Sequence, residues 1–230
     1  MKAQKKHHPN GSLLFLLCLL VQMTSVYAQS QIYDNFEGSK VLHYGERSGV
    51  LDTLMKNPLI NSVDSTKHCA LYVRNVAKKF DNIKMSFNGK LSDVSPYATY
   101  TGIPPKITMK IYTTAPPGTL IEILLGSKGR NNEYPAGTSS QYQAYTTVSN
   151  TWEIVQFKFS QIPQGSETST TQIDQMTLLF NPNSLTSETY YFDDISGPLL
   201  ISSGSEPVVA PVQGAKNPVP IGKQGSKKIK

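Results

Sequence analysis

The feature that most constrains this chain is an alternation of apolar and polar residues, repeated in short runs between residues 32 and 197. In Lys106–Thr113, for example, Ile107, Met109 and Ile111 share one face of an extended strand. No window keeps an apolar stripe of helical spacing through a dozen residues without a helix breaker. The sequence therefore predicts an all-β protein.

Turn residues divide this body into short strands. Pro116-Pro117-Gly118 separates Lys106–Thr113 from Thr119–Leu125, and we interpret these two runs as the arms of a hairpin. Each alternating face needs an apolar partner, and an open sheet leaves its edges exposed, so this many strands predict a two-sheet antiparallel β-sandwich. Further strands are expected at His68–Arg74, Asn82–Phe87, Trp152–Phe159, Gln175–Phe180 and Thr189–Ile195.

Residues 1–28 have the pattern of a secretory signal peptide. Lysines at positions 2, 5 and 6 precede Leu13–Val21, a run of nine apolar residues that is too short to span a bilayer as a helix. Val26-Tyr27-Ala28 then offers a signal-peptidase site, so cleavage is expected before Gln29; the alternative is an uncleaved anchor. We expect a secreted protein, whether extracellular, periplasmic or at the cell surface, without membrane insertion after signal removal.

The charge distribution argues against a nucleic-acid partner. The whole chain has a formal charge of +6, but residues 29–198 hold 14 basic and 15 acidic side chains. A near-neutral body provides no basic field for a polyanion. Residues 199–230 are rich in Pro, Gly, Ser and Lys and are expected to form a flexible tail. Signal removal takes Cys18 away and leaves Cys69 as a single cysteine, expected to be buried in a strand.

Four short segments, in this order, resemble a known family. They are Ile32–Gly38 (IYDNFEG), Cys69–Asn75 (CALYVRN), Trp152-Glu153 and Tyr190–Ile195 (YYFDDI). Their order and spacing resemble the galactose-binding-like jelly-roll sandwich of secreted bacterial carbohydrate-binding modules, especially those of Bacteroidetes polysaccharide-degrading proteins. The resemblance covers about residues 31 to 198. It implies a non-catalytic protein that binds a polysaccharide or a surface glycan.

The same resemblance implies a structural calcium ion. In such modules an acid of the first strand and an acid of the last strand meet beside Ca²⁺, and Glu37 and Asp194 stand at the matching positions. Ca²⁺ prefers carboxylate and carbonyl oxygens, so the chemistry fits. Asp193 and Asp194 point to opposite faces of a regular strand, which leaves open which of the two is the ligand. The alternative is that these acids are solvated or pair with lysines.

Sugar binding requires a flat apolar surface for the pyranose ring and planar polar groups for its hydroxyls. Two segments offer both, around residues 95 to 105 and in a long excursion from Gly126 to Asn150. The alternative for the excursion is a polar hairpin with its tyrosines on the sheet surface. Trp152, at the start of a strand, is expected in the core, and the alternative is an exposed platform for a sugar. The candidate carbohydrate-binding residues are Tyr134, Tyr142, Tyr145, Arg130 and Tyr100.

Catalysis has little support in the sequence. It contains no His-Glu-x-x-His, no Gly-x-Ser-x-Gly and no Gly-rich phosphate loop before a helix. A glycan-cleaving sandwich enzyme would need only two suitably spaced carboxylates and stays an alternative. A second alternative is a surface adhesion or scaffold domain without sugar specificity, which would share the sandwich and the signal.

Overall fold

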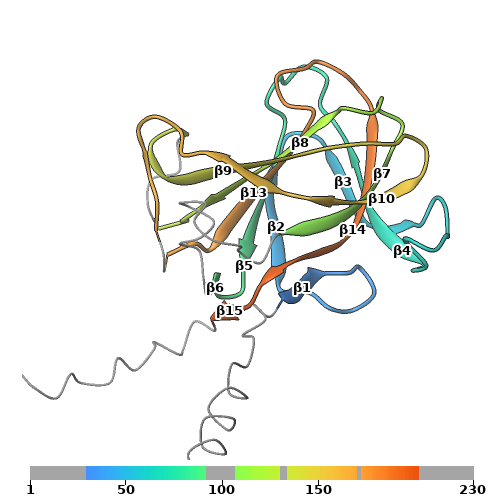
Figure 1. The fold of residues 1–230 in the computed structure, drawn as a ribbon, viewed down its shortest axis with the longest axis horizontal. Coiled ribbons are helices and arrows are strands. Elements are labelled where there is room, and N and C mark those ends of the chain that lie inside the picture. The colour runs from blue at the N-terminus through green and yellow to red at the C-terminus, as the bar shows by residue number, and fades with distance from the viewer. Residues whose placement is uncertain (1–29, 92–106, 130–133, 170–171, 202–230) are drawn as a thin grey trace, which may run out of the picture.

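A computed structural model describes residues 30–91, 107–129, 134–169 and 172–201 (Figure 1). The described residues form strands and connections, and they include no helix. Accordingly, no helix in this part of the chain is long and apolar enough to cross a membrane. The expected all-β class is confirmed.

One of the two main sheets has six strands. Its order is β10-β7-β14-β4-β3, and β1 pairs with the remaining part of β14; every pairing is antiparallel. The strands are β1 (Ser30–Asp34), β3 (Val50–Lys56), β4 (His68–Val73), β7 (Thr108–Thr113), β10 (Trp152–Gln156) and β14 (Thr189–Pro198).

The second main sheet has seven strands in the order β11-β9-β8-β13-β5-β2, with short β12 parallel to β9. They are β2 (Leu42–Arg47), β5 (Ile83–Phe87), β8 (Leu120–Gly126), β9 (Gly137–Tyr145), β11 (Lys158–Gln161), β12 (Ser166–Glu167) and β13 (Gln175–Phe180). A two-stranded ribbon joins β6 (Lys90–Leu91) to β15 (Leu200–Ile201).

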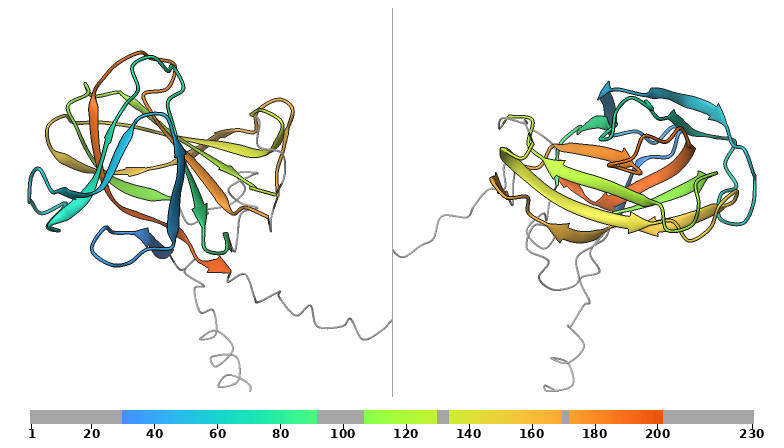
Figure 2. Two further views of the ribbon diagram at one scale, coloured as in Figure 1. Left: turned by 180° about the vertical axis from the view of Figure 1, so that it is seen from behind. Right: turned by 90° about the horizontal axis from the view of Figure 1, so that it is seen from above.

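The hydrophobic core lies between the two main sheets, which Figure 2 shows packed face to face. Phe180 of β13 stacks on Tyr190 of β14 with ring centroids 4.5 Å apart, so this pair joins the sheets directly. Ile111 of β7 and Ile123 of β8 belong to the same buried cluster. Burial of one face of each sheet is the main source of stability for such an architecture. The two-sheet antiparallel jelly-roll sandwich is confirmed.

Two local expectations are wrong. The runs on either side of Pro116-Pro117-Gly118 are not a hairpin, because β7 belongs to the six-stranded sheet and β8 to the seven-stranded sheet. The segment expected as one strand, Trp152–Phe159, is likewise divided between β10 and β11, which lie in different sheets. Alternation predicts which face of a strand is buried. Strands of either sheet bury one face in the shared core, so alternation does not indicate to which sheet a strand belongs.

Trp152 is buried, but outside the core between the sheets. It lies opposite Tyr112 of β7, on the outer face of the six-stranded sheet, and is 2% exposed. The connection from β3 to β4 covers it, since Asn57 Oδ1 accepts a hydrogen bond from Trp152 Nε1 at 3.0 Å. This connection covers Trp152 on the outer face of the six-stranded sheet.

Candidate functional site

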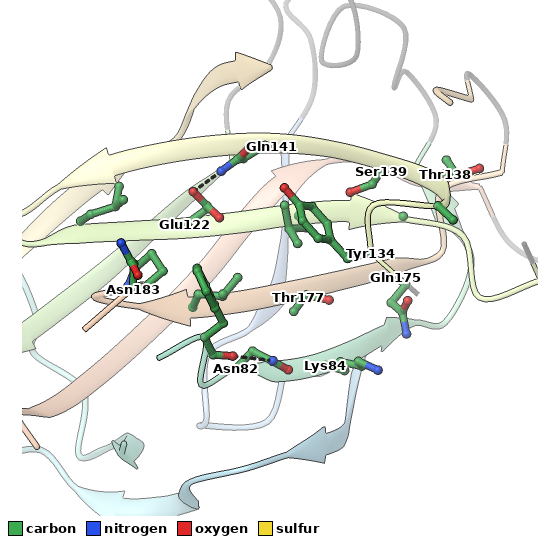
Figure 3. Close-up of a pocket in the computed structure, with 17 residues that line it drawn as sticks. Asn82, Lys84, Glu122, Tyr134, Thr138, Ser139, Gln141, Gln175, Thr177 and Asn183 are labelled. Carbon is green, nitrogen blue, oxygen red and sulfur yellow. Dashed lines mark hydrogen bonds between the residues drawn. The ribbon is translucent and has the colours of Figure 1, made fainter. Parts of the chain in front are cut away.

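A groove of about 480 Å³ lies on the outer face of the seven-stranded sheet (Figure 3). We call it the sheet groove. Its floor consists of strand residues of β5, β8, β9 and β13, and its rim of residues in adjoining connections. The strand residues are Lys84, Leu120, Glu122, Leu124, Gly126, Thr138, Ser139, Gln141, Gln175, Thr177 and Leu179, and the rim residues are Phe80, Asn82, Tyr134, Ala136, Pro182 and Asn183.

Strand alternation places these residues on the floor. Along β8, Ile121 and Ile123 pack in the core, so Glu122 and Leu124 face outward into the groove.

The register then aligns a row of side chains across neighbouring strands. Leu124 lies opposite Gln141 of β9 and Thr177 of β13, and Thr177 lies opposite Lys84 of β5. The row combines an aliphatic, an amide, a hydroxyl and an ammonium group on one surface.

Apolar surface lines both the floor and the rim. Leu120, Leu124 and Leu179 contribute aliphatic side chains to the floor. At the rim, Tyr134 is 58% exposed and Phe80 is 61% exposed. Figure 3 shows the Tyr134 ring on the groove side of the strands. Exposed rings beside an aliphatic floor provide the kind of surface on which the C–H face of a sugar packs.

Planar polar side chains form a hydrogen-bonded network on the same face. Gln141 Nε2 and Gln143 Nε2 both donate to Glu122 Oε2, the second at 2.9 Å. Gln161 Nε2 donates in turn to Gln141 Oε1 at 2.7 Å. Glu122 is 7% exposed and Gln141 8% exposed, so the centre of the network is buried, while Gln143 is half-buried and Gln161 is exposed. Amides and carboxylates held in this way have defined directions for recognising hydroxyl groups.

The three candidate tyrosines of the excursion lie in three different environments. Tyr134 lines the sheet groove. Tyr145 is 56% exposed on the same outward side of β9, two residues beyond Gln143, but outside the groove lining. Tyr142 is 1% exposed in the core, against Phe159 at 5.6 Å between ring centroids, and burial raises the pKa of its hydroxyl. Its ring is not available for stacking on a sugar, and the expectation for Tyr142 is corrected accordingly.

The expected long excursion contains a nine-residue strand. Gly137–Tyr145 forms β9, whose residues 139–145 pair with β8, and which also pairs with β11 and β12. Alternation along β9 sends Tyr142 inward and Gln141 and Gln143 outward, which a loop would not do. Arg130 and Tyr100, the other two candidates, lie outside the described residues.

The two expected calcium ligands occupy separate environments. Glu37 Oε1 accepts hydrogen bonds from the backbone amides of Lys67 and His68, both at 2.7 Å, and the His68 amide leads the contacts that lower the pKa of Glu37. Asp194 Oδ2 forms an ion pair with Lys110 Nζ at 2.6 Å. Because N–H groups bind the Glu37 carboxylate and an ammonium group binds the Asp194 carboxylate, this arrangement of the two side chains does not fit a cation site. No three His, Cys, Asp or Glu side chains among the described residues form a metal-binding group.

Asp193, beside Asp194, is fully buried. Its Oδ2 accepts a hydrogen bond from Thr66 Oγ1 at 2.7 Å, and Thr66 Oγ1 also lies 2.7 Å from Asp64 Oδ1. Burial raises the pKa of Asp193 to about 7. The strand is irregular here, since Asp194 has a φ of 46° and the register shifts after Asp193, so simple alternation does not describe this pair.

Cys69, in β4 of the same sheet as Asp193, is buried with a free thiol, as expected. Burial raises the pKa of this thiol to about 12, which leaves it protonated and unreactive at neutral pH.

Sequence reasoning did not select most of the groove residues. Phe80, Leu124 and Leu179 carry the apolar surface, and Glu122 and Gln141 the polar network. A signal was present, because Leu124 and Leu179 stand at outward positions where an antiparallel strand usually carries polar residues. Phe80 had no such signal, since it lies in a connection whose path depends on tertiary packing.

Comparison with known proteins gives similarities of architecture. No model of a known protein family matches the chain, and no curated protein matches it. Among solved structures, a family 11 carbohydrate-binding module of a cellulosomal cellulase of Clostridium thermocellum aligns with a TM-score of 0.46 and 16% identity, over 74% of this chain and 95% of that one. A family 30 carbohydrate-binding module aligns with a TM-score of 0.42 and 15% identity, over 67% and 89% of the two chains.

A xylan-binding domain of family 22 aligns similarly, with a TM-score of 0.39 and 14% identity over 77% of this chain and 97% of that one. Likeness at this level carries no argument about a ligand, which has to come from the groove itself. In its sandwich architecture, the chain is similar to these carbohydrate-binding modules.

Proposed function

We propose that this protein binds a polysaccharide in the sheet groove and does not cleave it. The observation that carries the proposal is the combination of an aliphatic floor, exposed rim rings and a buried, hydrogen-bonded pair of Glu122 and Gln141 in one groove of about 480 Å³. A pyranose has an apolar C–H face and a ring of hydroxyls, so it needs both kinds of surface at once. A groove on a sheet face also suits a chain better than a closed cavity would.

The carboxylates among the described lining residues support binding without cleavage. Among the described residues that line the groove, Glu122 is the only carboxylate. Hydrolysis of a glycosidic bond ordinarily needs two carboxylates on either side of that bond. Glu122 also accepts hydrogen bonds from two glutamines, which favours a role in binding.

The test is binding to a panel of soluble neutral polysaccharides, measured by affinity electrophoresis and calorimetry. The sugar hydroxyls are well hydrated, so stacking and hydrogen bonds leave only a modest net free energy of binding. A Kd on the order of 1 μM to 1 mM is therefore expected. Leu124→Arg places a long charged side chain on the floor and should weaken binding more than tenfold. Ile154→Arg is the matched control, because Ile154 is 58% exposed on the opposite sheet.

Two outcomes contradict the proposal. Binding that Leu124→Arg leaves unchanged would show that the site lies elsewhere, and no binding to any glycan in the panel would show that the function is wrong. Release of reducing sugar by the wild-type protein would instead establish catalysis.

A further inference from the structure

Glu122 is an unusual residue to find on the floor of the sheet groove. Its side chain is charged, yet it is 7% exposed at the centre of the seven-stranded sheet, between β9 and β13. Buried carboxylates are ordinarily compensated by a cation. Within the described part of the chain, no lysine, arginine or histidine forms an ion pair with Glu122. Its compensation comes from neutral groups.

Those neutral groups are the side-chain amides of Gln141 and Gln143. Both donate to the same oxygen, Oε2, so Oε1 retains its capacity to accept hydrogen bonds. A carboxylate can only accept, and it therefore fixes both amides with their N–H groups turned toward it. Gln141 Oε1 is consequently turned to the Gln161 amide, which donates to it. Glu122 sets the direction of the whole network.

The other charged side chain among the described lining residues does not offset Glu122. Lys84 lines the groove, but its Nζ lies 2.7 Å from Glu46 Oε2 and is paired there. Lys158 lies opposite Gln143 on β11, is exposed and does not line the groove. Among the described residues, therefore, no cation offsets this acceptor-only group, and because it is buried, water screens its charge poorly.

We propose that Glu122 restricts the sheet groove to uncharged glycans. Its carboxylate accepts a hydrogen bond from a sugar hydroxyl, and it excludes sugars that carry a carboxylate or sulfate at that place. The inference rests on the proposed function and adds the class of glycan. Like charges brought together at a desolvated site disfavour binding strongly, so discrimination of about tenfold or more is expected.

The experiment compares each glycan with its own charged derivative. Mixed-linkage β-glucan and glucomannan serve as probes, before and after oxidation of their primary C6 hydroxyls to carboxylates, and calorimetry measures both affinities. Wild-type protein should bind the oxidised chains at least about tenfold more weakly than the neutral chains. The ratio should persist in 0.5 M salt, because screening acts mainly on exposed charges.

Glu122→Gln keeps the size of the side chain and removes its charge. In this variant the ratio of the two affinities should fall to about threefold or less. Glu153→Gln is the matched control, since Glu153 lies on β10 in the other sheet, and it should retain the wild-type ratio. The wild-type ratio tests the inference without any variant, so a failure of Glu122→Gln to fold would leave it testable.

The outcomes separate the two proposals. Equal wild-type affinity for neutral and oxidised chains would overturn the role of Glu122 and leave polysaccharide binding in place, as would an unchanged ratio in folded Glu122→Gln. Binding of neither form of the glycans would overturn the proposed function together with this inference.

Discussion

Replacing two tyrosines that lie eight residues apart should separate binding from folding. Tyr134 is 58% exposed at the groove rim, whereas Tyr142 is 1% exposed between the sheets. Loss of an aromatic platform costs about 1–2 kcal/mol of binding, so Tyr134→Ala should raise Kd about 5- to 30-fold. An exposed substitution of this kind changes folding stability by about 0.5 kcal/mol or less.

Tyr142→Ala should have the opposite effect. Its ring packs edge-on against Phe159, and its hydroxyl lies 3.3 Å from Ser140 Oγ. Truncating a buried aromatic side chain to alanine costs about 3–5 kcal/mol of folding free energy. In a domain of this size the melting temperature should fall by about 6–20 °C.

Calorimetry with the bound glycan and thermal melts measure the two effects. Ile154→Ala is the control for Tyr134→Ala, because Ile154 has the same 58% exposure on the other sheet and should leave both quantities unchanged. Tyr145→Ala should weaken binding less than Tyr134→Ala, since Tyr145 lies outside the groove lining. The reasoning is refuted if Tyr134→Ala binds like wild type, or if Tyr142→Ala is as stable as wild type.

Three further predictions concern the rest of the chain. Because N–H and ammonium donors already occupy the Glu37 and Asp194 carboxylates, a chelator should leave the melting temperature unchanged. A lowered melting temperature together with copurifying calcium would contradict this, since an ion at 100 times its Kd contributes about 2.7 kcal/mol to the folded state. Amino-terminal sequencing of exported protein should begin at Gln29, and an intact Met1 on a soluble cytoplasmic protein would reject the signal peptide. With chelator present, Asp193 should contribute a decrease in unfolding free energy as pH rises from about 4 to 7, because the folded state holds a proton on this carboxyl, whose pKa is raised to about 7, more tightly than the unfolded chain does. Asp193→Asn should remove this contribution. If urea melts gave the same pH profile of unfolding free energy for this variant and for the wild-type protein, the assignment would be contradicted.

Strand positions and core residues could be predicted from local alternation, because burial of one face leaves a direct mark on the sequence. Met109 and Ile111 of β7 and Ile121 and Ile123 of β8 are all core residues, as the pattern indicates. Which sheet each strand joins could not be predicted in this way. A strand facing the core from either side has the same alternation, so the connection at Pro116-Pro117-Gly118 was interpreted as a hairpin turn although it passes between sheets.

The groove was harder to predict because it is assembled from four strands that are distant in sequence. Lys84, Leu124, Gln141 and Thr177 form one row only through the pairing of β5, β13, β8 and β9. Choosing aromatic residues of one long connection found Tyr134 and missed this row. Composition identifies what kinds of groups a sugar needs, and register decides which of them meet.

Separation of core and groove residues along single strands explains why specificity can change without loss of the fold. On β8, Glu122 faces the groove, while its neighbours Ile121 and Ile123 are at most 1% exposed in the core. A change at Glu122 alters hydrogen bonds with Gln141 and Gln143 on the outer face but removes no contact between the sheets. A change at Ile121 or Ile123 leaves a cavity between the sheets, with a cost of about 2–5 kcal/mol on truncation to alanine. Substitutions at neighbouring positions should therefore have different effects. A change at Glu122 should alter binding selectivity, and a change at Ile121 or Ile123 should lower the melting temperature.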